Sequence, residues 1–274
     1  WVGVLGMLLI MPLPFIPKRW KNWWTAANKK TPVIESPATP INKAVVVIPT
    51  YNERESINKA LDLVLNLPRK VDVLVVDDGS PDGTAEVVRS RPEFKKRVHL
   101  LEGKGKAGLG TAYRRGFQWA TKHGYEAAIE MDADLSHDPA DIPKLLEALE
   151  NGAHIAVGSR YLGGISVLNW PQSRLFISTF GGFYVRTLTA LPMSDPTSGF
   201  KAIRADVLRD LDWDKVQAEG YAFQIELHHT AWKQGYTIKE EPIVFTERRE
   251  GDSKMSTAIS LEAAWRVLRL AAVS

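Results

Sequence analysis

From Ala44 onward, short apolar runs alternate with stretches spaced like amphipathic helices, and this alternation limits the possible folds. The runs at 44–48 and 71–76 are rich in Val and Ile, which is typical of strands buried on both faces. Between them, apolar residues recur with helical spacing at Ile57, Leu61, Val64 and Leu65. The same pattern predicts strands near 98–102, 127–131 and 154–157, and helices near 84–91, 110–122 and 140–150. Repeated strand–helix–strand units predict an α/β fold with a mostly parallel sheet flanked by helices.

Composition excludes several classes of protein. Of the 274 residues, 45% are hydrophobic and 24% are charged, which is ordinary for a globular chain and excludes a disordered one. The absence of cysteine excludes disulfides, zinc fingers, iron–sulfur clusters and thiol catalysis. The net charge of +3 is too small to indicate nucleic-acid binding, and we expect no nucleic-acid partner.

Acidic residues gather where the predicted strands end. Glu53 follows the first strand, Asp77 and Asp78 follow the second, and Asp132 and Asp134 follow the fourth. Ligands of parallel sheets bind at the carboxyl ends of the strands, so these side chains should share one edge. Such a cluster repels itself unless a cation is present, and a hard cation such as Mg²⁺ or Mn²⁺ carrying a diphosphate suits carboxylates.

Two further strand-end features have competing interpretations. Asp82, just before Gly83 and Thr84, is predicted to be a helix N-cap. Residues 103–108 fit the G-x-G-x-x-G pattern of dinucleotide-binding dehydrogenases. That fingerprint normally follows the first strand, whereas here it follows the third, and Glu53 at the first turn would repel a pyrophosphate lacking metal. We favour a loop whose Lys104 and Lys106 face an anionic ligand.

Basic and apolar residues concentrate in two stretches without acids. Residues 151–194 contain Arg160, Arg174 and Arg186, and residues 18–30 contain five Lys or Arg residues. Both predict a surface for anionic lipid or phosphate, although a chance gap on a solvated face would look the same. The apolar run at 1–11 would reach only about 16 Å as a helix, too short to cross a bilayer. Because Trp and basic residues follow it, we expect membrane contact there, with a buried terminal helix as the alternative.

The strand-end motifs at 49–53, 77–84 and 132–137 resemble those of inverting nucleotide-sugar glycosyltransferases with the Rossmann-like GT-A fold. Further motifs narrow the resemblance to the dolichol-phosphate or polyprenol-phosphate mannose synthase family; they lie at 158–161, 169–171, 195–201, 221–226 and 248–254. The N-terminal part resembles the join to a preceding membrane domain in actinobacterial forms. We therefore expect a membrane-proximal segment and linker (1–43), a GT-A domain (44–257) and a C-terminal amphipathic helix (258–274). That helix would lie in the lipid interface or pack on the core.

The resemblance implies transfer of mannose from GDP-mannose to a polyprenyl monophosphate at the cytoplasmic face of a membrane. The partners would be these two substrates and a membrane surface or preceding transmembrane domain. By position, the resemblance implies a guanosine site at Pro49, Tyr51 and Glu53, with Val76 and Asp78 beside it. It implies a metal site at Asp132 and Asp134, with the Ala133 backbone near the sugar nucleotide. It also implies that Arg160 and Arg174 bind the acceptor phosphate and that Arg248 and Lys254 contact the donor diphosphate. The family varies at Ser136, where some members have Gln.

The chemistry expected of such a site needs no protein base. A phosphate monoester has a second pKa of about 6, so the acceptor oxygen is already an anion near neutral pH. We therefore expect in-line displacement with inversion, in which cations position the acceptor. Asp195 would cap the turn at 197–199, or else act as a base. A UDP-sugar donor and a non-catalytic nucleotide-sugar binding subunit remain alternatives.

Overall fold

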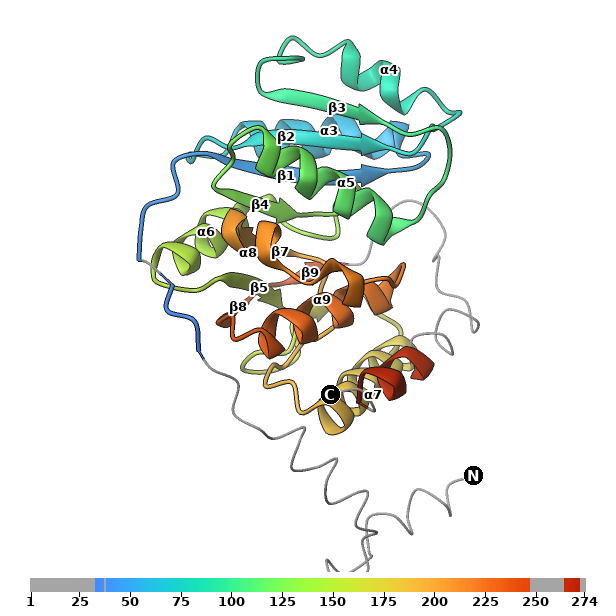
Figure 1. Cartoon of the computed structure of the whole chain (residues 1–274). Coiled ribbons are helices and arrows are strands. Elements are labelled where there is room, and N and C mark those ends of the chain that lie inside the picture. The colour runs from blue at the N-terminus through green and yellow to red at the C-terminus, as the bar shows by residue number, and fades with distance from the viewer. Residues whose placement is uncertain (1–32, 37, 247–263, 272–274) are drawn as a thin grey trace, which may run out of the picture.

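A seven-stranded sheet forms the centre of the molecule (Figure 1). The computed structural model describes residues 33–36, 38–246 and 264–271. The strand order is β3-β2-β1-β4-β7-β5-β8. The strands are β1 (Ala44–Thr50), β2 (Asp72–Asp77), β3 (Val98–Glu102), β4 (Ala127–Glu130), β5 (Ile155–Ser159), β7 (Lys201–Arg204) and β8 (Ile238–Pro242).

The pairing of the strands is parallel except at β7. β1 pairs in parallel with β2 and β4, β2 with β3, and β5 with β8, whereas β7 is antiparallel to both β4 and β5. The predicted α/β class is confirmed, and the antiparallel strand in its middle is an addition that the repeated strand–helix units did not predict. A separate parallel pair joins β6 (Val167–Leu168) to β9 (Phe245–Thr246).

Helices cover both faces of the sheet, and alternate residues of β1 show why. Val46 and Ile48 pack in one core cluster, whereas Val45 and Val47 pack in the other. The first cluster takes residues from α3 (Arg54–Leu65), α4 (Thr84–Arg89) and α6 (Ile142–Glu150); the second takes them from α5 (Leu109–Lys122), α8 (Ala205–Asp210) and α9 (Tyr221–Lys233). The side chains predicted to form the buried stripe of α3 lie in the first cluster or against it.

Asp82 organises the starts of two helices. Its carboxylate accepts hydrogen bonds from the backbone N–H of Arg54 and of Thr84, each at 3.0 Å. Gly83, with φ of 88°, holds the N-cap position of α4 itself. Asp82 therefore caps α4 as predicted, but from the position before the N-cap residue. It also caps the beginning of α3. Short 3-10 turns lie at η2 (Pro139–Asp141) and η3 (Trp213–Lys215).

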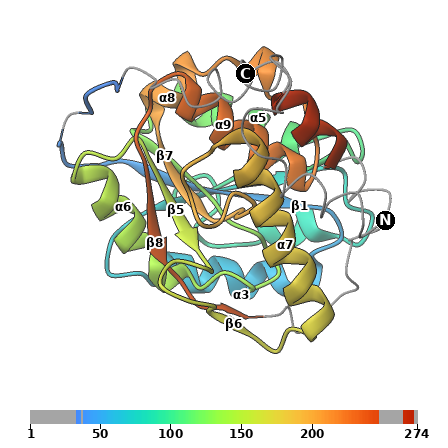
Figure 2. The same ribbon diagram turned by 90° about the horizontal axis from the view of Figure 1, so that it is seen from below.

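Helix α7 (Gln172–Thr189) lies away from the sheet, at the end of the molecule opposite α4 in Figure 1. The 264–271 helix, within the predicted amphipathic segment, packs beside it through a small cluster of Val185, Ile225 and Val267. The Tyr184 hydroxyl donates to the carbonyl of Ala264 at 3.2 Å. Figure 2 also shows the 264–271 helix beside α7. Of the helices that the structure describes, none has the length and hydropathy needed to cross a membrane.

Candidate active site

A cavity of about 670 Å³ opens at the carboxyl ends of β1, β2 and β4 and extends to α7, α9 and the 264–271 helix. Four of the five predicted strand-end acids line it: Glu53, Asp78, Asp132 and Asp134. Pro49, Tyr51 and Ala133, predicted for the sugar nucleotide, line it as well. The chemistry of the lining changes along its length, from carboxylates at the strand ends to apolar side chains between the helices.

Two residues predicted from the second strand lie outside this lining. Val76 is fully buried in the core under α5. Asp77 is buried too, and its carboxylate accepts hydrogen bonds from Thr50 Oγ1 at 2.8 Å and from Ser80 N at 2.9 Å. Asp77 therefore fixes the turn that presents Asp78. The carboxylate of Asp78 is held in turn by Arg115 at 3.1 Å.

The Asp132–Asp134 turn is shaped by its own hydrogen bonds. Ser136 N donates to Asp134 Oδ1 at 3.1 Å, and Leu135 between them has a positive φ of 62°. The Tyr113 hydroxyl, from α5, lies 3.4 Å from Asp132 Oδ1. Burial raises the pKa of Tyr113 well above its usual range, and the carboxylate of Asp132 adds to that shift. The phenol therefore stays protonated and is a constant donor to Asp132.

His137 supports the same turn through a hydrogen bond to its backbone. Its Nδ1 accepts from the Asp132 backbone N–H at 3.3 Å, and its ring stacks on Phe200 with centroids 4.9 Å apart. Burial lowers the pKa of His137 to about 4, so the imidazole is neutral at physiological pH. A neutral acceptor at Nδ1 matches the observed hydrogen bond and adds no positive charge beside the two carboxylates.

The residues at this turn fit a divalent cation such as Mg²⁺ or Mn²⁺. Asp132 and Asp134 offer hard oxygen donors at the cavity wall, the ligand type these ions prefer. Across the described ranges, no set of three or more acidic or His side chains is arranged to hold a metal. A cation here would complete its shell with phosphate oxygens and water, as Mg²⁺ usually does. The buried Ser136 hydroxyl, which lines the cavity and has no hydrogen-bond partner among the described residues, is a further oxygen at the site.

Arg160 lies deeper in the cavity and is held by Asp195. Its Nε and Nη2 donate to the two oxygens of Asp195, each at 2.6 Å, and its backbone N–H donates to Oδ2 at 3.1 Å. Burial alone would raise the pKa of Asp195, but the charge and hydrogen bonds of Arg160 outweigh it, and the pKa is lowered. Thr197 Oγ1 also donates to Asp195, at 3.2 Å. Asp195 thus positions Arg160 as well as bonding within its own turn.

Trp170 carries the second arginine. The guanidinium of Arg174 lies 4.3 Å from the centre of the Trp170 ring, and that of Arg160 lies 5.6 Å from it. All three residues line the cavity. The indole therefore brings two cations together in the wall of the cavity. Both predicted acceptor-phosphate residues are together here, although they are 14 residues apart in the chain.

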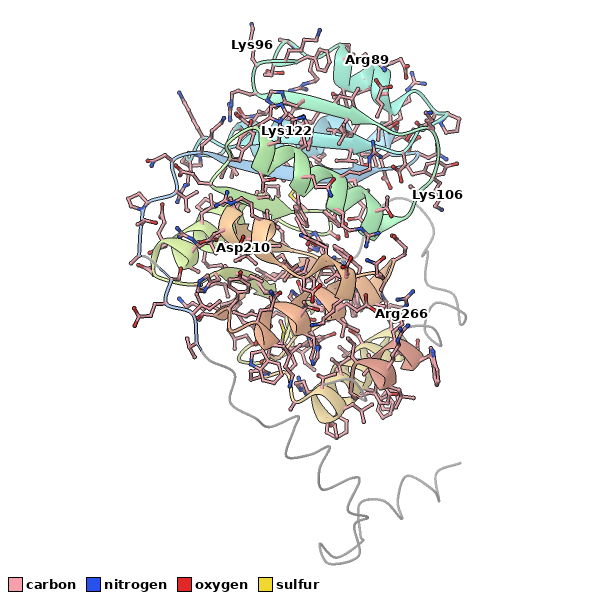
Figure 3. The ribbon with its side chains drawn as sticks, viewed as in Figure 1. Arg89, Lys96, Lys106, Lys122, Asp210 and Arg266 are labelled. Carbon is pink, nitrogen blue, oxygen red and sulfur yellow. The ribbon has the colours of Figure 1, made fainter. Side chains whose placement is uncertain are left out.

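The loop at 103–108 behaves as a wall of the site. Lys106 lines the cavity, and its Nζ lies 5.1 Å from the centre of the Tyr51 ring, whereas Lys104 is exposed outside the lining. Figure 3 shows Lys106 on the loop that leads into α5. Gly103 is tightly packed, since a Cβ there would lie 2.9 Å from the Arg115 guanidinium. The contacts with Arg115 and Asp78 give Gly103 a packing role in this loop that involves no dinucleotide.

A buried polar group beneath the cavity was not predicted. Lys201 donates to Glu130 Oε2 at 3.0 Å and also to Gln224, whose amide donates to the same carboxylate oxygen at 2.9 Å. Burial raises the pKa of Glu130 and lowers that of Lys201, and each partner's charge opposes part of the other's shift. Gln224 lines the cavity, so this group forms part of its floor. The predicted residues Arg248 and Lys254 lie outside the described residues.

A Rossmann-like sheet that ends in an Asp-Ala-Asp turn beside a cavity of this size defines a glycosyltransferase with the GT-A fold. The chain belongs to glycosyl transferase family 2, which it matches over residues 45–212. This assignment confirms the glycosyltransferase resemblance found in the sequence. It does not support the dehydrogenase interpretation of the motif at 103–108.

Two relatives cover most of the chain. A polyprenol monophosphomannose synthase of Mycolicibacterium smegmatis is 44% identical over 239 residues, 85% of this chain and 89% of that protein. An undecaprenyl-phosphate mannosyltransferase of Micrococcus luteus is 43% identical over 227 residues, 83% of this chain and 93% of that one. Among solved structures, glucosyl-3-phosphoglycerate synthase of Mycobacterium tuberculosis, crystallised with Mn²⁺ and UDP, superposes with a TM-score of 0.64 at 18% identity. The superposition covers 84% of this chain and 80% of the synthase chain, and it shows similarity of the fold.

Proposed function

We propose that the protein transfers mannose from GDP-mannose to a polyprenyl monophosphate, with inversion at the sugar carbon. The observation that carries this proposal is that one cavity is lined by carboxylates at the strand ends, by two arginines beside Trp170, and by apolar side chains of α7 and the 264–271 helix. A sugar nucleotide with its metal suits the first part, a phosphate the second and an isoprenoid chain the third. The names of the two relatives support the polyprenyl acceptor and the mannosyl group.

The residues at the strand ends would bind the donor. Tyr51, Glu53 and Lys106 all line the cavity, and a nucleoside can lie against the tyrosine ring. Asp132 and Asp134 would hold Mg²⁺ or Mn²⁺, and the cation would supply positive charge to balance the charge that grows on the leaving diphosphate. The Mn²⁺ crystallised with a structural relative supports a divalent cation. Arg248 and Lys254 remain proposed contacts to the same diphosphate.

Arg160 and Arg174 would position the acceptor phosphate for attack. The phosphate oxygen is ionised near neutral pH, so it attacks the sugar carbon directly and no proton needs to be removed. Asp195 is a poor base in this geometry, because its carboxylate is fully buried, paired with Arg160 and outside the cavity lining. Its contribution is to hold the guanidinium of Arg160 rigid, so that Arg160 keeps the acceptor phosphate oriented for attack.

The proposal includes association with a membrane, because the acceptor is a lipid, and a catalytic domain on the cytoplasmic face. The acid-free stretch at 151–194 contributes α7 and both arginines of the acceptor wall. The apolar end of the cavity lies between α7 and the 264–271 helix and includes Ile177, Val185 and Val267. An isoprenoid chain could leave the phosphate along these side chains and enter the bilayer.

The test is to supply purified protein with polyprenyl phosphate and, separately, radiolabelled GDP-mannose, UDP-glucose or UDP-N-acetylglucosamine. Label should enter the organic phase from GDP-mannose, disappear with a chelator and return when Mg²⁺ or Mn²⁺ is added in excess. Label from a UDP-sugar alone would contradict the donor assignment, and label that survives the chelator would contradict the metal. Donor binding without transfer from any sugar would indicate a binding subunit instead.

A further inference from the structure

Gln224 lines the cavity from the first turn of α9, although it is only 2% exposed. Its Oε1 accepts a hydrogen bond from Lys201, and its Nε2 donates to Glu130 Oε2 at 2.9 Å. The ammonium of Lys201 can only donate, so Oε1 must face it, and Nε2 must then face the carboxylate. Both charged side chains are fully buried, so the pair fixes the direction in which the amide points.

One hydrogen of the Gln224 amide is left over. Nε2 carries two hydrogens and Glu130 takes one, and across the described ranges Nε2 has no second acceptor. Gly199 lies beside it in the cavity lining, where an added Cβ would be 3.4 Å from Nε2, so no side chain occupies the space on that side. A fixed donor of this kind in a cavity wall is suited to an oxygen atom of a bound molecule.

The register of the sheet shows where along the site this amide is held. Lys201 in β7 pairs with Glu130 in β4 and with Val157 in β5, and β7 lies between these two strands. Asp132 follows Glu130 by two positions, and Arg160 follows Val157 by three. Lys201 therefore holds the amide over the strand that separates the one leading to the carboxylate turn from the one leading to an acceptor arginine.

The start of α9 is anchored beside the carboxylate turn. Phe223 stacks on Tyr113 with the ring centroids 6.0 Å apart, and the Tyr113 hydroxyl lies 3.4 Å from Asp132 Oδ1. Glu226 accepts hydrogen bonds from two backbone N–H groups of the segment before the helix, at 2.8 and 2.7 Å. These two neighbours of Gln224 in the sequence keep its amide at a constant place in the cavity wall.

An in-line displacement brings the transferred sugar to the same place. The attacked carbon lies between the leaving diphosphate and the attacking phosphate, so the sugar ring must lie between the groups that bind them. Lys201 and Glu130 carry opposite charges, so the wall presents a neutral amide there rather than a net charge. A neutral donor suits a sugar hydroxyl, whereas a phosphate is better matched by the guanidinium groups of the arginines.

We propose that Gln224 recognises the transferred sugar by donating its second amide hydrogen to a hydroxyl oxygen of the mannosyl group. Lys201 and Glu130 are positioning residues, because they hold the amide in the orientation that offers this hydrogen. A site built to bond a hydroxyl discriminates against a sugar that lacks it. The inference rests on the proposed function, since it needs a nucleotide sugar and an acceptor phosphate in one cavity, and it adds the residue that reads the sugar.

Comparing GDP-mannose with GDP isolates the contact with the sugar. Gln224→Met should weaken calorimetric binding of GDP-mannose with Mn²⁺ about three- to tenfold, the effect of one hydrogen bond, and leave binding of GDP with Mn²⁺ unchanged. Unchanged GDP binding also shows that the variant folds. Gln234→Met at the C-cap of α9 is the matched control, because this amide too bonds through both its oxygen and its nitrogen but lies outside the cavity lining. It should bind both ligands like the wild type.

A series of GDP-deoxymannoses, each lacking one hydroxyl, identifies the group that is recognised. The wild type should bind at least one analogue about three- to tenfold more weakly than GDP-mannose. Gln224→Met should bind that analogue and GDP-mannose equally, because the hydrogen bond is already absent from the variant. If the losses from the substitution and from the missing hydroxyl add for every analogue, the amide does not contact the sugar.

Equal weakening of GDP and GDP-mannose by Gln224→Met would show that the amide supports the nucleotide site or the fold, and would refute the proposal. Unchanged binding of GDP-mannose would refute it too, and a raised KM for polyprenyl phosphate would then place the amide at the acceptor. If the wild type binds no GDP-mannose, the proposed donor is wrong. The same comparison, made between the nucleotide sugar that does bind and its nucleoside diphosphate, still decides whether Gln224 contacts the sugar.

Discussion

Replacing Asp195 with asparagine tests whether this residue positions Arg160 or acts as a base. The substitution keeps the shape of the side chain but removes its charge. The Asp195 carboxylate is fully buried and accepts three hydrogen bonds from Arg160, whose side chain is only 8% exposed. Breaking a buried ion pair by removing one partner leaves an uncompensated charge and costs about 3–5 kcal/mol. We expect Asp195→Asn to lower the free energy of unfolding by that amount at pH 7.

The control is Asp212→Asn, because the Asp212–Lys215 pair is made by exposed side chains and should contribute no more than about 1 kcal/mol. Urea unfolding followed by tryptophan fluorescence measures both variants. The pKa of Asp195 is lowered in the folded protein, so its stabilising contribution is present above its ordinary pKa of 3.8 and is lost as the pH falls through the folded value. The gap between wild type and Asp195→Asn should therefore be full at pH 7 and shrink below about pH 4.

Kinetics separate the two roles of Asp195. A positioning residue should raise the KM for the acceptor phosphate as well as lower kcat, because Arg160 loses its fixed orientation. A variant as stable as the wild type, with an unchanged acceptor KM and a loss confined to kcat, would refute this reasoning and point to a base.

Three further predictions concern the scaffold. Gly116→Ala should destabilise by about 1–3 kcal/mol in urea unfolding, since its Cβ would lie 2.4 Å from a β1 valine methyl; Gly181→Ala in α7, with open space around it, should be neutral or slightly stabilising. Lys201→Met should cost about 3–5 kcal/mol, and adding Glu130→Met should recover part of it because no unpaired charge remains; equal stability of the single and double variants would contradict this. Burial lowers the pKa of His229 to about 4, so its contribution is present above pH 6.5 and declines as the pH falls towards 4. His229→Leu should flatten the pH dependence of the free energy of unfolding, measured with urea, by up to about 3 kcal/mol over that range, and an unchanged dependence would argue against a neutral buried imidazole.

The sequence was most informative where one chemical pattern repeats locally. Runs of Val and Ile and helical spacing predicted β1, β2 and α3, because burial on two faces or one face leaves a direct trace in residue order. The strand-end acids predicted the carboxylate end of the cavity, since parallel strands must end at the same edge.

Contacts between distant segments of the chain were harder to predict from the sequence. Lys201 sits in the antiparallel strand β7 and pairs with Glu130, and a single Lys between apolar residues does not reveal that it is buried. The pairing of Arg160 with Asp195 depends on how the turn at 195–199 packs against β5, which spacing does not encode. Aromatic residues on α7 predict burial as readily as exposure, and the structure shows that three of them face outward.

The central claim is that one cavity brings a sugar nucleotide and a lipid phosphate together. The most direct measurement is mannosyl transfer by purified protein from radiolabelled GDP-mannose to polyprenyl phosphate, with Asp132→Asn and Asp134→Asn variants in parallel. The account predicts label in the lipid for the wild type and little or none for either variant, with thermal unfolding of the variants close to that of the wild type. Absence of labelled lipid with the folded wild type, or equal labelling by all three proteins, would contradict it.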